Sequence, residues 1–283
     1  MTKILAIDLG TSYFKFAMFD RAGALCHLAH LEPPIQRPRA NRMEIEAEAF
    51  IDSLGQGIGQ VGGASDGLAD VEAVTFSTQT NSFLLLGPDD APLTPMILWP
   101  DLRAAPLEAE IRHCSAIPGL RAVTGIPGLS AQFMIAKLLW LQRQQPRAWR
   151  QAARLCLISD FLSLLFTGQH VSEAGAAGLT ALVDIRDCRW WPKMCRSVGL
   201  EVGWLPAVVR AGTDLGELRP QVAQRLGLPR RCRFIVGCLD QYAAAISADN
   251  VSPGATSESS GTVLATISCA DWMSDDLRPE VFQ

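Results

Sequence analysis

The chain has 283 residues, of which 48% are hydrophobic and 19% charged, so it can bury a sizeable core as one large domain or two smaller ones. Its 25 basic and 29 acidic residues give a net charge of −4, and without a basic surplus we do not expect nucleic acid or an anionic membrane as its partner. The eight cysteines and four histidines are dispersed without a C-x-x-C pair, which argues against a zinc cluster and predicts reduced, buried thiols in a cytoplasmic protein.

The first elements of the chain are three short strands in an antiparallel meander. Apolar and polar residues alternate in the segments 3–8, 13–20 and 24–30. The turn Asp20-Arg-Ala-Gly23 is short enough to join the second and third strands as a hairpin. From Glu46 onward, apolar residues with helical spacing predict a helix, at positions 47, 50, 51, 54, 58 and 61.

Strands and helices alternate in the rest of the chain. We expect further strands at 71–77, 83–86, 154–158, 234–236 and 263–267, and helices at 108–112, 133–145, 160–166 and 241–248. The most apolar stretch, 155–166, contains Asp160 and is far shorter than the ~20 residues that cross a bilayer, so we expect no membrane span. A meander followed by this alternation predicts an α/β fold with a mixed sheet.

The first motif is the corner between the first two strands. Asp8 ends a strand and is followed by Gly10, Thr11 and Ser12, so the hairpin tip offers backbone N–H groups, two hydroxyls and a glycine that a phosphate can approach closely. Asp8 would repel a bare phosphate, but a divalent cation between them removes the conflict, and the combination suits a magnesium nucleotide. The alternative is an ordinary hairpin in which Asp8 and Ser12 cap a turn.

Two later corners also follow or precede expected strands. Ser259-Ser-Gly261-Thr262 suits a second phosphate-contacting turn, although the same residues are common in turns of any kind. Asp240 follows a buried strand and precedes a helix. It is either a helix cap or a general base held close to a hydroxyl nucleophile at the carboxyl end of a strand.

The segment 77–104 gathers groups that are typical of sugar sites. Gln79 and Asn81 supply amides, Asp101 a carboxylate, Arg103 a guanidinium and Trp99 an aromatic face. A polar loop with one buried tryptophan is the alternative. Two other patterns indicate no site: 57–62 matches G-x-G-x-x-G without a preceding strand, and the sequence has no G-x-x-x-x-G-K-[ST], so we expect no P-loop.

The order of these motifs resembles the FGGY family of carbohydrate kinases, which includes xylulose and glycerol kinases. The resemblance extends over essentially the whole chain. It rests on the Asp-x-Gly-Thr-Ser hairpin, the glutamine-containing polar strand, the Trp99-x-Asp101-x-Arg103 loop, the Asp240-Gln241 corner, the Ser-x-Gly-Thr turn and a Thr-Gly-x-Pro segment before Lys-Leu-Leu-Trp at 137–140. It implies the ribonuclease-H-like fold of the actin and sugar-kinase superfold.

The resemblance implies ATP and Mg2+ as cofactors and a small carbohydrate as substrate. Asp8 would hold the Mg2+, and Asp240 would take the proton from a sugar hydroxyl as it attacks the γ-phosphoryl group. The residues implied to face the nucleotide phosphates are Gly10, Thr11, Ser12, Lys15, Gly261 and Thr262. Those implied to hold the sugar are Gln79, Asn81, Asp101 and Arg103. A homodimer is one assembly that the sequence allows.

The chain departs from the family's pattern in two segments and in length. Where xylulose kinases usually have Gln-Met-His-Gly, it has Gln79-Thr-Asn-Ser82, and Gly175-Ala-Ala-Gly178 corresponds to their Ser-Asp-Ala-Ser, so we name no single sugar. Family members continue into a second domain of similar size. We therefore expect the N-terminal sugar-kinase domain at 1–248 and only the beginning of the nucleotide-side C-terminal domain at 249–283.

Three functions remain open at this point. The first is ATP-dependent phosphorylation of a hydroxyl on a small sugar or polyol, such as a pentulose. The second is a catalytically silent relative that binds a carbohydrate or regulates a partner, because we expect a truncated second domain. The third is an ATPase of the actin or chaperone branch, which the Trp99-x-Asp101-x-Arg103 loop and the Asp240-Gln241 corner disfavour.

Overall fold

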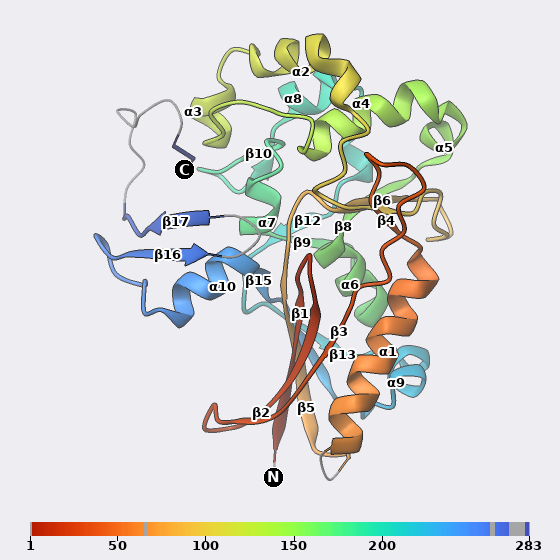
Figure 1. Ribbon diagram of the computed structural model, residues 1–283, viewed down its shortest axis with the longest axis vertical. Coiled ribbons are helices and arrows are strands. Elements are labelled where there is room, and N and C mark those ends of the chain that lie inside the picture. The colour runs from red at the N-terminus through yellow and green to blue at the C-terminus, as the bar shows by residue number, and fades with distance from the viewer. Residues whose placement is uncertain (1, 65–66, 261–263, 272–280, 283) are drawn as a thin grey trace.

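The computed structural model describes residues 2–64, 67–260, 264–271 and 281–282, and its centre is a seven-stranded sheet (Figure 1). The strands in spatial order are β13 (Asp214–Glu217), β14 (Arg233–Ile235), β5 (Val71–Thr78), β1 (Lys3–Leu9), β2 (Phe14–Asp20) and β3 (Leu25–Leu31), with β15 (Cys238–Leu239) also paired to β5. β1, β2 and β3 are antiparallel, whereas β1, β14 and β15 run parallel to β5. The expected meander and mixed sheet are therefore confirmed.

The meander forms because one face of its strands is apolar and its turn has the right residues. In β1, Leu5, Ile7 and Leu9 are buried while the residues between them are half-buried. In the turn, the Asp20 carboxylate accepts hydrogen bonds from the backbone N–H groups of Ala22 and Ala24. Gly23 adopts a φ of +83°, which glycine reaches without steric cost.

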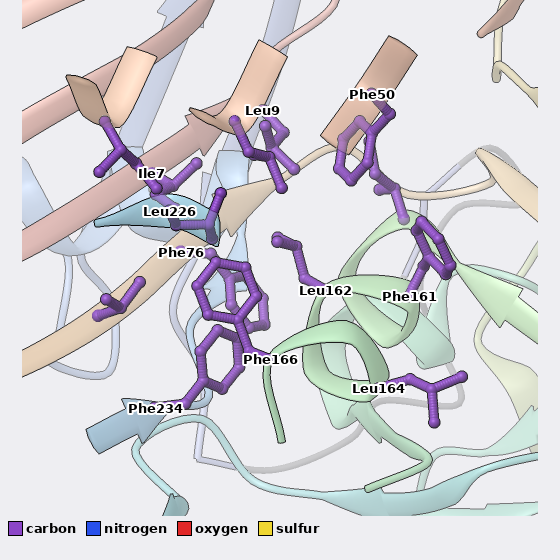
Figure 2. Packing of buried hydrophobic residues seen from close by; sticks show 14 of the residues in the cluster. Ile7, Leu9, Phe50, Phe76, Phe161, Leu162, Leu164, Phe166, Leu226 and Phe234 are labelled. Atoms are coloured by element: carbon purple, nitrogen blue, oxygen red, sulfur yellow. The ribbon is translucent and has the colours of Figure 1, made fainter. Parts of the chain in front are cut away.

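Three helices cover the apolar face of the central sheet (Figure 1): α1 (Ala47–Ala64), α6 (Ile158–Thr167) and α9 (Pro220–Leu226). The core between them contains aromatic rings from strands and helix alike (Figure 2). The ring centroid of Phe234 lies 5.0 Å from that of Phe166 and 5.8 Å from that of Phe76. This core holds β1 and β5 in fixed register, which matters for the groups at their carboxyl ends.

The glycine pattern at 57–62 lies inside α1 and packs against the sheet. A Cβ atom on Gly57 would lie 2.1 Å from the ring of Phe16, so the glycine allows the helix to approach β2 closely. It is a packing feature and not a phosphate loop, as expected from the absence of a preceding strand.

A second core lies beside the first around an antiparallel sheet of β4 (Glu44–Ile45), β7 (Met96–Ile97), β6 (Phe83–Leu86) and β8 (Arg154–Leu157). The helices around it are α2 (Glu108–Ser115), α3 (Leu120–Thr124), α4 (Met134–Gln144), α5 (Pro146–Gln151) and α8 (Pro192–Ser197) (Figure 1). Leu138 and Leu141 of α4 are fully buried, which explains the apolar side of this helix in the sequence.

Short elements complete the described residues. They are the pairs β9 (Val171–Glu173) with β12 (Ala207–Val209) and β10 (Val183–Asp184) with β11 (Arg189–Trp190), the helices α7 (Ala174–Gly178) and α10 (Asp240–Ser247), and the hairpin β16 (Thr256–Ser260) with β17 (Leu264–Ser268). Two 3₁₀ turns lie at Ala105–Leu107 and Val202–Trp204. The predicted domain boundary at residue 248 falls between α10 and the hairpin, and it stays a prediction.

The expected thiol environments hold only in part. All eight cysteines are free, and Cys114, Cys156, Cys195 and Cys232 are buried. Cys26 and Cys188 are exposed instead, because one lies on the edge strand β3 and the other in the turn between β10 and β11. Among the described residues, no helix combines the length and the apolar character needed to cross a membrane.

Candidate active site

A cavity of about 780 Å³ lies at the carboxyl ends of β1, β5 and β15. Parallel pairing aligns Leu9 with Thr78 and Thr78 with Leu239, so the residues that follow these strands leave the sheet at one level. The cavity is lined by most of the predicted site residues, namely Asp8, Gly10, Thr11, Ser12, Lys15, Gln79, Asn81 and Asp240. Segments far apart in the sequence thus converge on one site, as is usual at the carboxyl edge of a sheet.

The hairpin tip presents one carboxylate and one ammonium to the cavity. Asp8 and Lys15 are directly opposite in the β1–β2 register, and Lys15 Nζ lies 3.0 Å from Asp8 Oδ2. Ser12 is exposed at the tip. At Gly10 a Cβ atom would lie 3.0 Å from the carbonyl oxygen of Tyr13, so the tight corner favours glycine.

Asp240 is the first residue of α10 and shares the cavity with this pair. Its Oδ1 accepts a hydrogen bond of 2.7 Å from the backbone N–H of Gln241. The pKa of Asp240 is raised to about 6: burial is the main cause and the nearby Asp8 carboxylate adds to it, while the Gln241 hydrogen bond and Lys15 oppose the rise. A carboxylate of this basicity can accept a proton near neutral pH.

The donor set fits a magnesium ion bound together with phosphates. Mg2+ commonly takes one or two carboxylates from the protein and completes its octahedron with phosphate oxygens and water. Asp8 supplies a hard oxygen ligand at the wall of the cavity, beside Gly10, Thr11 and Ser12 of the hairpin tip. No group of three or more His, Cys, Asp or Glu side chains suited to a metal occurs among the described residues, so an all-protein metal cage is absent from them.

Gln79 lies at the wall of the cavity within a chain of hydrogen bonds. Its Oε1 accepts from Ser82 Oγ at 3.1 Å and from Thr11 Oγ1 at 3.5 Å. The backbone N–H of Trp99 donates to Ser82 Oγ at 2.8 Å, and the indole Nε1–H of Trp99 donates to Thr11 Oγ1, also at 2.8 Å. The tryptophan that the sequence indicated therefore lines the cavity and also connects the hairpin tip to the polar strand end.

Asn81 lines the cavity, but its amide is tied to the backbone at both ends. Oδ1 accepts from the N–H of Met134 at 2.9 Å and Nδ2 donates to the carbonyl of Leu179 at 3.0 Å. Its φ of +59° is a left-handed conformation that asparagine tolerates better than most residues. Asn81 thus fixes the shape of the turn, and only its remaining N–H and lone pairs are left for a ligand.

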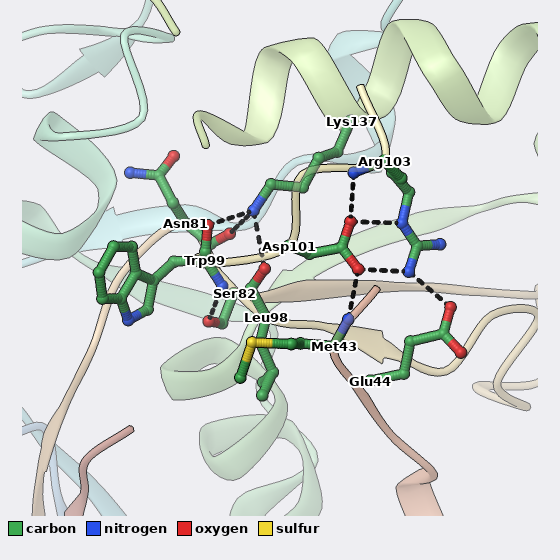
Figure 3. A network of polar contacts seen from close by, with 9 residues as sticks. All are labelled: Met43, Glu44, Asn81, Ser82, Leu98, Trp99, Asp101, Arg103 and Lys137. Atoms are coloured by element: carbon green, nitrogen blue, oxygen red, sulfur yellow. Dashed lines mark hydrogen bonds and ion pairs between the residues drawn. The ribbon is translucent and has the colours of Figure 1, made fainter. Parts of the chain in front are cut away.

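The structure does not bring Asp101 and Arg103 to the cavity, which corrects the expectation that they hold the sugar. Figure 3 shows them paired with each other instead. Both are buried, with exposed fractions of 0% and 2%. Arg103 Nε and Nη2 each lie 2.8 Å from the Asp101 carboxylate, and Nη2 also pairs with Glu44 at 2.5 Å. Burial acts to raise the pKa of Asp101, but hydrogen bonds from Arg103 and from the Met43 amide lower it below its usual value. Two opposite charges that are buried together neutralise each other, so they form a structural pair.

Sequence reasoning missed two buried charged residues beside the site. Lys137 of α4 is fully buried, and its Nζ donates to the carbonyls of Asn81, Leu98 and Trp99 at 3.2, 2.9 and 3.1 Å (Figure 3). Burial lowers the pKa of Lys137 to about 7, although Asp101 raises it. A lysine between the apolar positions of an amphipathic helix was the signal that could have revealed this role.

Glu173 is the second of these residues. Its carboxylate accepts hydrogen bonds of 2.8 Å from the backbone N–H groups of Gly175 and Ala176, and one from Leu239, the residue before Asp240. Because α7 also supplies the Ala176 carbonyl that accepts from Thr80, this short helix touches both the Asp240 corner and the polar turn. Gly261 and Thr262 lie outside the described residues, while Ser259 and Ala265 of the same hairpin line the cavity.

Comparison with known proteins agrees with this geometry. A xylulose kinase of Lactococcus lactis is 29% identical over 251 residues, which are 87% of this chain and 49% of that protein. Among solved structures, a ligand-bound xylulose kinase from Lactobacillus acidophilus has a TM-score of 0.86 at 21% identity, over 94% of this chain and 54% of that one. A Plasmodium falciparum glycerol kinase with ADP has a TM-score of 0.81 at 20% identity, over 93% and 53%.

The chain therefore spans about half the length of the curated relatives it matches. The structural likeness confirms the expected actin and sugar-kinase fold. The model of the FGGY family of carbohydrate kinases, N-terminal domain, matches residues 3–247. On this match over most of its length, the chain belongs to the FGGY family of carbohydrate kinases.

Proposed function

We propose that the protein takes part in ATP-dependent phosphorylation of a hydroxyl group on a small sugar or polyol, with Asp240 as the general base. The single observation that carries this proposal is the position of Asp240. Its carboxylate, with a pKa raised to about 6, shares one cavity with the Asp8–Lys15 hairpin and with the polar turn that carries Gln79. Xylulose and glycerol kinases among the relatives support the substrate class.

In the proposed reaction, Asp240 accepts the proton of the attacking hydroxyl as its oxygen bonds to the γ-phosphorus. The bond between that phosphorus and the bridging oxygen breaks, and the electron pair leaves with ADP. The backbone N–H groups of the hairpin at Gly10–Ser12 and the Lys15 ammonium would face the phosphates, and Asp8 would hold Mg2+, which neutralises phosphate charge when bound. Such a site needs positioning and charge stabilisation more than covalent chemistry.

The sugar would lie between Asp240 and the Gln79–Asn81 turn, with the Trp99 ring forming part of the wall. Among the described residues, the lining of this part contains amides, hydroxyls and apolar groups, such as Ser130, Gln132 and Phe133. Apart from Asp8, Lys15 and Asp240, the described residues that line the cavity carry no carboxylate or ammonium, so a neutral polyhydroxyl ligand matches the chemistry of this part.

The test combines turnover and binding. We expect ADP release from ATP in the presence of at least one sugar in a panel of ketoses, aldoses and polyols. Asp240→Asn should lower the turnover at least 100-fold while the calorimetric affinity for that sugar changes less than about threefold. Equal losses of turnover and binding would indicate a structural role for Asp240.

The alternative, a relative that binds carbohydrate without transferring phosphate, is favoured by the Asp8–Lys15 ion pair. With Lys15 Nζ 3.0 Å from Asp8 Oδ2, a metal at Asp8 has to compete with an ammonium already in contact. Sugar binding by the wild type without any ADP release in this panel would support that alternative.

A further inference from the structure

Two chains of hydrogen bonds, which we call arms, begin at Trp99 and end at the same atom, Gln79 Oε1. One arm runs from the backbone N–H of Trp99 to Ser82 Oγ and on to Gln79 Oε1, over 2.8 and 3.1 Å. The other runs from the indole N–H of Trp99 to Thr11 Oγ1 and on to the same Oε1, over 2.8 and 3.5 Å. We call these contacts the Trp99–Gln79 circuit.

The donors of the circuit are arranged in one direction. A backbone N–H and an indole N–H can only donate, so both hydroxyls accept from Trp99. In the structure the single proton of each hydroxyl is directed at Gln79, and the atom that accepts from both is the amide oxygen Oε1. Oε1 therefore faces Ser82 and Thr11.

The amide nitrogen of Gln79 then remains on the side of the cavity. The residue lines the cavity while only 3% of its surface is exposed, and none of the described residues accepts a hydrogen bond from its Nε2. Nε2 is not one of the buried side-chain atoms that lack a partner, so it is open to the cavity, where a ligand oxygen can accept from it in place of water.

We propose that Gln79 binds the substrate as a hydrogen-bond donor only, because the Trp99–Gln79 circuit fixes its orientation. The ligand it selects is a carbohydrate that places an oxygen lone pair there, either a carbonyl oxygen or a hydroxyl that acts as acceptor. This inference rests on the proposed function, since it assigns a role in the sugar half of the same cavity. It makes Ser82 and Trp99 positioning residues for Gln79.

The circuit also restricts Thr11. Its hydroxyl accepts from Trp99 and donates to Gln79, so the proton is not available for a phosphate. Any phosphate contact of Thr11 must therefore come from its backbone N–H. Thr11 belongs to the phosphate hairpin and Gln79 to the sugar half, so the same hydrogen bonds join the two halves of the cavity.

Calorimetry with D-xylulose and its analogues tests the donor role. In each analogue one hydroxyl is replaced by hydrogen or by fluorine, which accepts weakly but cannot donate. The hydroxyl that contacts Gln79 is identified by comparing two proteins: removing it weakens binding to the wild type but does not weaken binding to Gln79→Met. For the wild type we expect the affinity for that deoxy analogue to be about tenfold lower than for D-xylulose, and the affinity for the fluorinated analogue to fall clearly less.

If no hydroxyl position responds while Gln79→Met still weakens D-xylulose about tenfold, the acceptor is the carbonyl oxygen, which supports the inference as well. Ser82→Ala removes the hydrogen bonds that pass through Ser82 Oγ, so the Gln79 amide can rotate and exchange the positions of its oxygen and nitrogen. The difference in affinity between the fluorinated and the deoxy analogue should then become smaller. Gln142→Met is the matched control, since the Gln142 amide donates to the Val198 carbonyl outside the cavity lining and should leave affinity unchanged.

Two results would overturn the donor role while leaving the proposed function intact. One is a fluorinated analogue as weak as its deoxy counterpart at the mapped position, and the other is unchanged binding of D-xylulose by Gln79→Met. Absence of binding of every ketose, aldose and polyol of the panel by the wild type would overturn the inference and the proposed function together. Thermal unfolding of each variant identifies any that does not fold, and the wild-type comparison of fluorinated with deoxy analogues requires no variant.

Discussion

Asp240 illustrates how the surroundings of one side chain determine what it can do. Burial raises its pKa to about 6, with Asp8 as a further cause and Lys15 as an opposing one. As a general base it must be ionised, so we expect turnover to fall about tenfold per pH unit below pH 6 and to level off above it. The pH dependence of kcat measures this, and a flat profile between pH 5 and 7 would contradict the assignment.

The same pKa shift predicts a stability effect. Between the ordinary pKa of 3.8 and about 6, the folded chain binds a proton at Asp240 that the unfolded chain does not, so this group's contribution to stability is lost as the pH rises through that window. At pH 7.5 the ionised carboxylate therefore destabilises the fold by roughly 1–3 kcal/mol. Asp240→Asn should unfold at a higher temperature than the wild type at pH 7.5, and the gap should close near pH 3.5.

Asp8 gives the prediction for the nucleotide side. If its carboxylate holds Mg2+ beside the phosphates, Mg-ATP should raise the unfolding temperature of the wild type and Asp8→Asn should lose most of that gain. Omitting magnesium should have the same effect as the substitution. Lys3→Met, at the opposite end of β1, is the control that should keep the full shift. A wild type that magnesium and ATP leave unshifted would count against nucleotide binding by this chain.

The positions of residues were predictable where the backbone alone decides them. Asp8 lies near the end of β1, while Gln79 and Asp240 follow β5 and β15, and strand order with register brings them together. Asp101 and Arg103 were misplaced because their partner Glu44 is 59 residues from Arg103, and a one-dimensional pattern does not show that a carboxylate and a guanidinium satisfy each other in the interior. The direction of the Gln79 amide depends on two hydroxyls from different segments and is likewise invisible in the sequence.

At the scale of elements, two glycines of α1 separate the effect of side-chain packing on stability from the effect of helix propensity. A Cβ on Gly57 would lie 2.1 Å from the fully buried ring of Phe16, whereas a Cβ on Gly59 meets no atom within 4 Å. Gly57→Ala should therefore lower the free energy of unfolding by about 1–3 kcal/mol because the ring must move. Gly59→Ala should raise it by up to about 1 kcal/mol because alanine favours the helix. Denaturant titration compares the two, and equal effects would contradict the close contact.

Elements with an apolar pattern were predicted well even when short, and the elements between α6 and β14 were not expected. The meander, α1 and α4 lie within a few residues of their expected bounds because their apolar positions repeat, and the short strands β6 and β8 were found from their apolar runs. The region from β9 to α9 consists of pieces two to seven residues long, which are too short to show a period.

At the scale of the whole molecule, Lys137 connects the two cores. α4 belongs to the second core, whereas Leu98, whose carbonyl Lys137 binds, packs in the first. The other two carbonyls belong to Asn81 and Trp99, which line the cavity. The buried Lys137 side chain thus connects residues of the cavity wall to both cores, and its Nζ donates one hydrogen bond to each of the three carbonyls.

Lys137→Met keeps the length of the side chain but removes the donor to three carbonyls, of which, within the described residues, only that of Leu98 keeps another one, the N–H of Asp101. We expect the free energy of unfolding to fall by about 1–3 kcal/mol, the cost of leaving polar groups unpaired in the interior. Lys193→Met is the matched control, because Lys193 donates to a single carbonyl, that of Pro118, at the surface, and its loss should change the free energy by less than about 0.5 kcal/mol.

A purely structural lysine would lower stability alone. If Lys137 also positions the cavity wall, the folded Lys137→Met protein, kept well below its unfolding temperature, should bind sugar several-fold more weakly than the wild type, because Asn81 and Trp99 are no longer fixed. Calorimetry on the folded variant separates the two roles. Unchanged sugar affinity together with lower stability would limit Lys137 to holding the cores together.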